Sequence, residues 1–307
     1  MKSRFKPDRG LTSRMLITTF LLGLLYVVFA AVLLVLMKSA LWAVVIAGAL
    51  LLAQYWFSDR IALFAMGGRT VTREQAPELH AVVDRLCALA DMPKPAVAMA
   101  DVDIPNAFAT GRSQQRAVLC VTTGLMRRLD TEELEGVLSH ELSHVAHRDV
   151  AVMTIASFLG VLAGLITRMG LYSGFYGGFG GGRGRGRDGD NTALLFLVVV
   201  LVSAVVYALS FLLTRALSRY RELSADRSGA LLTGRPSALA SALTKVSGSI
   251  AQIPTRDLRQ AEPFNAFFFA PAIAQGFSLS SLFSTHPPLE KRLAQLATLS
   301  RELGQAV

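Results

Sequence analysis

The sequence predicts a helix-rich α+β domain that is interrupted by a hydrophobic hairpin and belongs to a multi-pass membrane protein. First, the 307-residue chain is 52% hydrophobic and 17% charged, whereas average soluble chains are about 25% charged. Second, its hydrophobic residues gather in four long stretches. Third, the rest of the chain combines helical apolar spacing with short apolar runs of strand length. This composition excludes an ordinary soluble protein and a disordered one.

The four hydrophobic stretches predict about four transmembrane segments, at residues 15–37, 40–57, 150–166 and 192–214. A span needs about 20 apolar residues, within a range of about 17–25. The first, second and fourth stretches meet this length. The third is at the lower limit and also fits a buried core helix. The first stretch is too long for the apolar region of a signal peptide, which favours an uncleaved anchor.

Charge predicts the orientation of these segments. Residues 1–14 contain one acid, Asp8, and five basic residues: Lys2, Arg4, Lys6, Arg9 and Arg14. Basic residues collect on the cytoplasmic side, so this basic tail is predicted to be cytoplasmic. Two transmembrane helices (15–58) and a transmembrane hairpin (150–214) then leave 59–149 and 215–307 in the cytoplasm as two parts of one domain. The arginines in the Gly/Arg-rich loop 170–190 oppose this orientation, so the depth of the hairpin stays open.

The net charge of +9 has two interpretations. In a soluble protein it would suggest nucleic acid, but in a membrane protein it more often reports topology. We therefore expect the lipid bilayer as a partner and no nucleic acid. The loop 170–190 is interpreted as a flexible connector, with an RNA-binding segment as the alternative.

The soluble parts predict four helices and two strands. Thr72–Gln75 fits a capping box that opens a helix, which continues to Ala90 before Pro93. Apolar runs at 96–100 and 117–121 have strand length and flank the segment 106–111. Asp130 and Glu133 form a second capping pattern, which starts another helix. Helices are also predicted from about 215 to 232, continuous with the fourth stretch, and at 289–299. Cys87 and Cys120 are predicted to be reduced core residues.

The second of these helices contains the sequence His140-Glu141-Leu142-Ser143-His144. Residues four apart lie on one helix face, so both imidazoles can bind one metal ion. Zn²⁺ suits two nitrogen ligands, a third protein ligand and an open position for water. Glu141 is placed to take a proton from that water. The alternative is a surface helix with ordinary histidines, and His147 is expected to face solvent or lipid headgroups.

Glu222 is the leading candidate for the third ligand. Asp226 lies four residues later on the same helix face and is placed to accept a hydrogen bond from a ligating imidazole. The alternative is a solvated charged helix that leaves a membrane, with neighbouring arginines as partners. An even number of crossings would bring Glu222 and the two histidines to the same side of the bilayer.

These residues carry a resemblance to a known family. SHELSHVAHRD, followed after a hydrophobic hairpin by RELSAD, resembles the HtpX-type integral membrane zinc metalloproteases, which are related to the CAAX prenyl proteases. The two N-terminal spans, the NAFATG segment and a late Thr285-His286-Pro287-Pro288 extend the resemblance over most of the chain. It implies a zincin-like domain with one Zn²⁺ per chain on His140, His144 and Glu222. It also implies a catalytic role for Glu141 and a supporting position for Asp226 outside the ligands.

The resemblance further implies a function and a location. We expect a membrane-bound, zinc-dependent endopeptidase that degrades misfolded or damaged membrane proteins, using zinc-activated water with Glu141 as general base. Its site would face the cytoplasm at the bacterial inner membrane. An exposed strand edge would bind substrate backbone by β-augmentation through Asn106, Ala107, Phe108 and Ala109. His286 would stabilise the transition state. A plain strand and a turn before a helix are the respective alternatives.

Other functions remain open on the sequence. A non-proteolytic membrane scaffold or chaperone would use a closed, structural zinc site. A prenyl-CAAX endopeptidase would need a large intramembrane chamber, for which four apolar segments are too few. The sequence does not identify the natural substrate, the cleavage preference or the oligomeric state.

Overall fold

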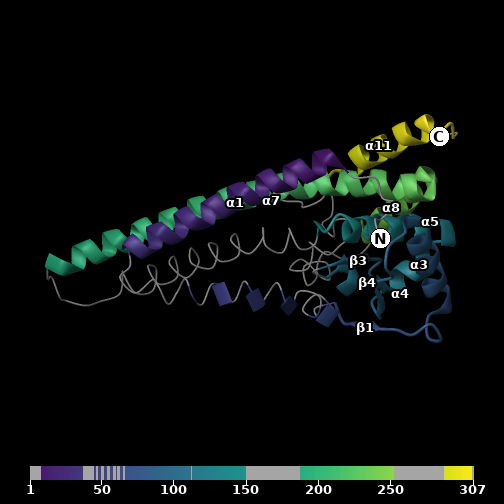
Figure 1. Cartoon of the computed structure of the whole chain (residues 1–307), viewed down its shortest axis with the longest axis horizontal. Coiled ribbons are helices and arrows are strands. Elements are labelled where there is room, and N and C mark those ends of the chain that lie inside the picture. The colour runs from purple at the N-terminus through teal and green to yellow at the C-terminus, as the bar shows by residue number, and fades with distance from the viewer. Residues whose placement is uncertain are drawn as a thin grey trace. The chain divides into compact units, whose positions relative to one another are not determined.

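A computed structural model describes residues 8–36, 66–111, 113–149, 187–251 and 287–305, with scattered residues between 45 and 64 (Figure 1). The chain divides into two compact units. The α+β unit comprises residues 1–11, 56–151 and 218–307. The hydrophobic unit comprises residues 12–55 and 152–217. A helix-rich α+β domain is therefore confirmed, and each unit is described separately below.

The α+β unit contains a four-stranded mixed sheet with the strand order β1-β2-β4-β3. The strands are β1 (Gly68–Thr70), β2 (Ala96–Ala100), β3 (Ala107–Thr110) and β4 (Val118–Thr122). β2 and β4 are parallel, whereas β1 and β3 pair antiparallel to their neighbours. Among the described strands β3 therefore lies at one edge, with Ala109 opposite Leu119.

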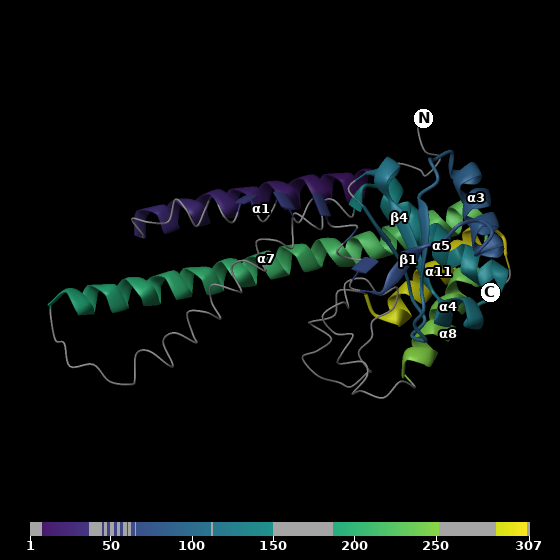
Figure 2. The same ribbon diagram turned by 90° about the horizontal axis from the view of Figure 1, so that it is seen from below.

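Among the described residues, five α-helices and a short 3₁₀ helix lie wholly within the same unit. They are α3 (Pro77–Ala90), η1 (Gln114–Arg116), α4 (Thr123–Arg128), α5 (Thr131–Ala146), α8 (Pro236–Ala251) and α11 (Leu289–Glu302). The end of α7 (Arg187–Thr233) from Ser218 onward joins them. Figure 2 shows α3 and α5 beside the sheet.

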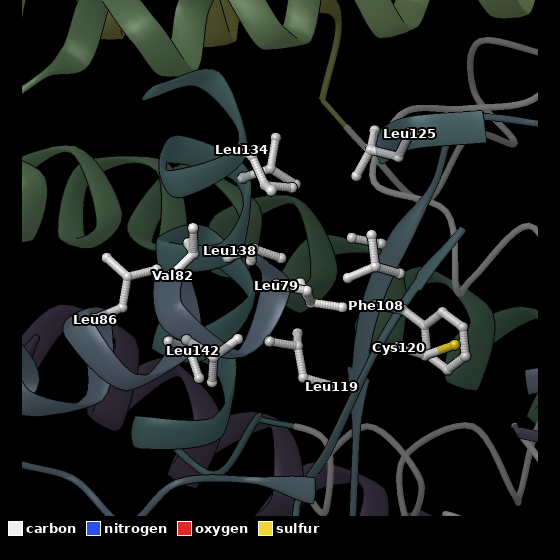
Figure 3. Close-up of a cluster of buried hydrophobic side chains, with 14 of the residues drawn as sticks. Leu79, Val82, Leu86, Phe108, Leu119, Cys120, Leu125, Leu134, Leu138 and Leu142 are labelled. Carbon is white, nitrogen blue, oxygen red and sulfur yellow. The ribbon is translucent and has the colours of Figure 1, made fainter. Parts of the chain in front are cut away.

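The core of the α+β unit forms where α3 and α5 pack against the sheet (Figure 3). Both helices bury apolar side chains at helical spacing, namely Leu79, Val82, Leu86, Leu134, Leu138 and Leu142, and Leu119 of β4 faces them from the sheet. Phe108 of β3 is paired with Cys120 and lies with it on the opposite face of the sheet, where both are also buried. Cys87 and Cys120 are free, buried thiols within this cluster, which confirms their prediction as core residues. α5, which carries the HExxH sequence, is thus anchored along one face by the core.

The helix boundaries show where local signals suffice. The predicted capping box of α5 forms completely, because Asp130 and Glu133 each accept the other's backbone N–H. The predicted start of α3 at Thr72 is wrong. Gln75 Oε1 does accept the Thr72 N–H at 2.8 Å, but α3 begins at Pro77. The proline ring disfavours a helical conformation for the residue before it, whereas proline itself suits the first helical position.

The remaining elements follow the sequence in part. β2 has the predicted bounds, β4 is shifted by one residue, and α11 begins where predicted. The sequence did not predict β1, α4 or α8. β1 has only three residues and shows no alternation, and α4 has six. α8 begins at a proline at position 236 but has no acidic residue in its first turn.

The hydrophobic unit contains most of α1 (Arg9–Leu36) and the first part of α7. Two helical stretches, Arg9–Val32 and Leu197–Thr233, are long and apolar enough to cross a membrane. They bear large exposed apolar side chains such as Phe20 and Leu212, while Phe29 and Val206 pack together.

These two helices correspond to the first and fourth predicted segments, so the described part of the chain contains two candidate membrane helices of the four that were predicted. The segment 150–166 lies outside the described residues, and 40–57 largely does, so both remain predictions. α7 begins at Arg187, before the predicted start of its apolar stretch, and continues to Thr233 as one helix.

Candidate metal centre

α5 positions the two histidines and the glutamate of the HExxH sequence. His140 and His144 lie one turn apart, so their rings meet on the same side of the helix. Their Nε2 atoms are 3.3 Å apart, and the rings are nearly perpendicular. His140, Glu141 and His144 are all buried, although they are polar. A buried polar cluster of this kind requires partners that satisfy it.

α7 adds Glu222 to this pair. Its carboxylate oxygens lie 3.7 Å from His140 Nε2 and 3.5 Å from His144 Nε2. Together these three residues are the group in the described part of the chain that could hold a metal ion. Two ligand atoms bound tetrahedrally to Zn²⁺ lie about 3.3 Å apart, from Zn–N distances of about 2.0–2.1 Å. The three separations of 3.3, 3.5 and 3.7 Å lie at this value or up to 0.4 Å above it.

Gly229 allows α7 to approach α5 this closely. A Cβ atom at Gly229 would lie 2.8 Å from the backbone nitrogen of His140 and 2.9 Å from Ser139 Oγ. Gly229 follows Glu222 by seven residues, which is close to two full helical turns. It therefore lies on the same face of α7 as Glu222, and that face is in van der Waals contact with α5.

Two buried carboxylates lie behind the histidines. Asp226 Oδ1 is 2.9 Å from His140 Nδ1, and Asp149 Oδ2 is 2.8 Å from His144 Nδ1. A carboxylate at Nδ1 favours the tautomer in which Nδ1 carries the hydrogen. Both Nε2 atoms then present lone pairs toward each other at 3.3 Å. This arrangement is repulsive without a cation between them, so the donor set fits a metal ion.

Each of these carboxylates pairs with a buried arginine. Arg292 of α11 donates to Asp226 through Nε and one terminal nitrogen, at 2.7 and 2.6 Å. Arg221 Nε lies 3.1 Å from Asp149 Oδ2. Burial alone would raise the pKa of Asp149, but Arg221 and His144 hold it below its ordinary value. The arginines thus keep Asp149 and Asp226 charged beside the histidines.

Glu141 points to a different neighbour. Its Oε2 accepts the backbone N–H of Ala109 on β3 at 3.1 Å, and its Oε1 lies 4.0 Å from His140 Nε2. Burial raises the pKa of Glu141 above the ordinary value for a glutamate. A carboxylate beside a metal position with a raised pKa is suited to exchange protons.

The metal-free histidines also have shifted pKa values. Burial lowers the pKa of His144, but its hydrogen bonds to Asp149 and Glu222 outweigh burial and raise the value to about 9. The pKa of His140 is raised in the same way by Asp226 and Glu222 against burial. In the metal-free chain a proton therefore competes for these nitrogens, and a metal ion would displace it.

The predicted substrate residues lie on or next to β3, and the predicted edge is less exposed than expected. Asn106, Ala107 and Phe108 are buried, and Ala109 is half-buried. Asn106 is engaged in the fold, because its backbone N–H donates to Thr122 Oγ1 at 2.9 Å. The geometry thus brings the backbone of Ala109 to the site.

One other predicted residue is not brought to the metal position, and a second lies outside the described residues. His147 lies at the end of α5, half-buried, and its Nδ1 contacts the carbonyl oxygen of Ser143 at 2.8 Å. It is not part of the ligand group. His286 lies outside the described residues, so its role remains a prediction.

Sequence reasoning missed Asp149, Arg221 and Arg292. Asp149 ends the stretch SHELSHVAHRD, five residues after His144, and this proximity was a usable signal. Arg221 adjoins Glu222 but was considered only as a solvated charge. Arg292 carries no such signal, because it reaches Asp226 from a helix 66 residues away in sequence.

Comparisons with known proteins agree with this site. The model of peptidase family M48 matches residues 73–300. The chain is 64% identical over 306 residues to "Protease HtpX homolog 1" of Streptomyces coelicolor, covering 100% of this chain and 98% of that relative. It is 54% identical over 305 residues to "Protease HtpX homolog" of Moorella thermoacetica, covering 99% of each.

A solved structure supports the fold. The crystal structure of S. mikatae Ste24p superimposes with a TM-score of 0.52 at 21% identity, covering 94% of this chain and 67% of that chain. At this identity the likeness concerns the fold alone.

Proposed function

Because the chain belongs to peptidase family M48 and is a homologue of the HtpX proteases, we propose that this metallopeptidase is a zinc-dependent endopeptidase that cleaves misfolded or damaged membrane proteins. The observation that carries the chemistry is the convergence of His140, His144 and Glu222 beside Glu141. One zinc ion per chain would be held by these three ligands.

Zinc, Glu141 and the backbone of Ala109 have separate roles in the proposed reaction. When bound, zinc would lower the pKa of a water molecule and polarise the scissile carbonyl. Glu141 takes the proton from the attacking water and later delivers it to the leaving amine. Its raised pKa suits both transfers, because a carboxylate that holds a proton too weakly is a poor acid in the second. The Ala109 N–H holds the Glu141 carboxylate in place.

β3 supports the proposed mode of substrate binding. In an antiparallel pair, backbone groups alternate between pointing to the partner strand and pointing away. Thr122 donates its N–H to the carbonyl of Asn106, so the backbone groups of Asn106 point toward β4. By the alternation, the backbone N–H and C=O groups of Ala107 and Ala109 point away from β4, toward the free edge of the strand. An extended substrate would bind along this edge beside Glu141, with main-chain hydrogen bonds and loose sequence preference.

The proposed location is the cytoplasmic membrane, with the active site facing the cytoplasm and membrane proteins as substrates. Two candidate membrane helices and the basic N-terminal tail support it.

Replacement of Glu141 by Gln tests the mechanism. The purified full chain in detergent, loaded with zinc, should lose at least about 100-fold in peptide-bond cleavage, because general acid–base catalysis contributes about 10²–10⁴-fold. Its zinc content should match the parent. Glu78→Gln, an exposed change on α3, is the matched control and should cleave normally. Unimpaired cleavage by Glu141→Gln would overturn the mechanism and leave a structural zinc site as the better account.

The substrate class needs a separate comparison. The parent should cleave a destabilised membrane protein in mixed micelles faster than the same protein in its stable form. Equal rates on both forms would refute the proposed selectivity for damaged proteins.

A further inference from the structure

The first turn of α1 contacts α7 on both sides of the ligand Glu222. Asp8 Oδ2 accepts a hydrogen bond from Ser224 Oγ at 2.6 Å. A Cβ atom at Gly10 would lie 2.5 Å from Tyr220 Oη, so the Tyr220 hydroxyl lies directly against the α1 backbone at Gly10. Tyr220 precedes Glu222 by two residues, and Ser224 follows it by two. All of these residues belong to the α+β unit.

Helix geometry places this contact behind the metal ligand. Residues four apart share a helix face, so Tyr220 and Ser224 lie together, as do Glu222 and Asp226. Two residues correspond to a rotation of about 200°, which puts the two pairs on opposite sides of α7. One side contacts α5 through Gly229 and Asp226, and the other contacts the first turn of α1. The turn that carries Glu222 is thus held from two sides.

The Asp8 carboxylate joins the two helices through both of its oxygens. Oδ1 accepts the Leu11 N–H at 2.8 Å and caps the start of α1, while Oδ2 binds Ser224. Leu11 and Ser224 are buried, so water cannot easily replace this contact. A shift of α7 along or about its axis would break the Ser224 bond and bring Tyr220 against the α1 backbone.

We propose that Asp8 is a positioning residue for metal binding: it fixes α7 through Ser224 so that Glu222 meets His140 and His144 at ligand distance. The proposal rests on the zinc site proposed above. It assigns a role in the metal centre to the basic N-terminal segment, in which Asp8 is the single acid. Without this role, the segment would only set the orientation of the chain in the membrane.

The test compares zinc affinities of the full chain in detergent, measured by competition with a chromophoric chelator. Removing a contact partner outside the ligands typically costs about 10–100-fold in metal affinity. Asp8 does not contact a ligand itself but acts through Ser224 on the helix that carries Glu222, so Asp8→Ala should weaken zinc binding by about 3- to 10-fold. Ser224→Ala removes the same hydrogen bond with a smaller change and should have a similar effect. The double variant should be no weaker than Asp8→Ala alone.

Matched measurements separate positioning from general stability. A merely structural Asp8 would lower the melting temperatures of the metal-free and zinc-loaded forms equally and leave zinc affinity unchanged. Asp8→Asn, which keeps one acceptor oxygen, should recover part of the affinity. Asp84→Asn makes the same charge change on α3 and should bind zinc like the parent.

The outcomes are distinct. Parent-like zinc affinity in both Asp8→Ala and Ser224→Ala would overturn the positioning role. If Asp8→Ala fails to fold, Ser224→Ala alone decides, because it removes only one hydroxyl. Failure of the parent itself to bind zinc would instead refute the proposed function.

Discussion

Gly229 sets the distance between the two helices that carry the metal ligands, and its replacement by alanine tests the proposed site. The new Cβ would start 2.8 Å from the His140 backbone nitrogen, whereas ordinary contacts begin at 3.4 Å. The helices must therefore separate by about 0.6 Å, and both closest atoms belong to α5 residues held by the core. Overpacking of this kind typically costs about 1–3 kcal/mol of stability.

The same movement acts on the ligands. Glu222 already lies 3.7 Å from His140 Nε2, near the upper end of what tetrahedral zinc accommodates. A further displacement of several tenths of an ångström should weaken zinc binding, and a misplacement of about 1 Å can cost about 100-fold in rate. We expect Gly229→Ala to lose about 10-fold or more in cleavage rate at a fixed zinc concentration.

Chelator competition and cleavage of a fluorogenic peptide measure the two effects. Gly248→Ala on α8 is the matched control, since a Cβ there meets nothing within 4 Å. It should keep full activity and gain up to about 1 kcal/mol, because glycine is a poorer helix former than alanine. Parent-like zinc affinity and cleavage in Gly229→Ala would refute the reasoning that this contact sets the ligand geometry.

Three further predictions concern the neighbours of the ligands. Asp149→Asn removes the charge beside His144 and should weaken zinc binding by about 10–100-fold in the chelator assay; unchanged affinity would contradict its role. Arg292→Leu leaves the Asp226 carboxylate buried without its charged partner and should cost about 3–5 kcal/mol in denaturant unfolding, so a loss below about 1 kcal/mol would speak against the pair. Although burial lowers the pKa of His144, Asp149 and Glu222 outweigh burial and raise the value to about 9, so zinc must displace a proton from this ring below that pH; zinc affinity in the chelator assay should therefore rise with pH up to about 9, and an affinity independent of pH would contradict this effect of the neighbouring carboxylates.

The sequence predicts those parts of the site whose information is local. The capping box at Asp130 fixes where α5 begins, and helical spacing then places His140 and His144 on one face. The same spacing relates Glu222 to Asp226 within α7. Only the meeting of the two helices required an assumption, namely an even number of membrane crossings.

The parts that the sequence could not predict depend on contacts between distant segments. Arg292 pairs with Asp226 across 66 residues, and Ser224 binds Asp8 across 216. Neither pair has a spacing that periodicity can detect. Gly229 is similar, because a glycine inside a helix signals close packing only when the neighbouring helix is known. The predicted start of α3 was wrong for a local reason, because the capping pattern at Thr72 was considered without the proline at position 77.

The charges buried around the ligands explain why these distant arginines matter. Among the described residues that contact the site, six charged side chains are buried: Glu141, Asp149, Glu222, Asp226, Arg221 and Arg292. Four carboxylates against two guanidinium groups leave two negative charges when the imidazoles are neutral. Uncompensated charge is costly in a buried site, and one divalent ion neutralises this excess. In the metal-free chain protons take that place, which is why the pKa of His144 rises to about 9. Without the two arginines the four carboxylates would leave four negative charges, and a single divalent ion would neutralise only two of them. Arg221 and Arg292 therefore bring the buried charge to the value that one Zn²⁺ balances.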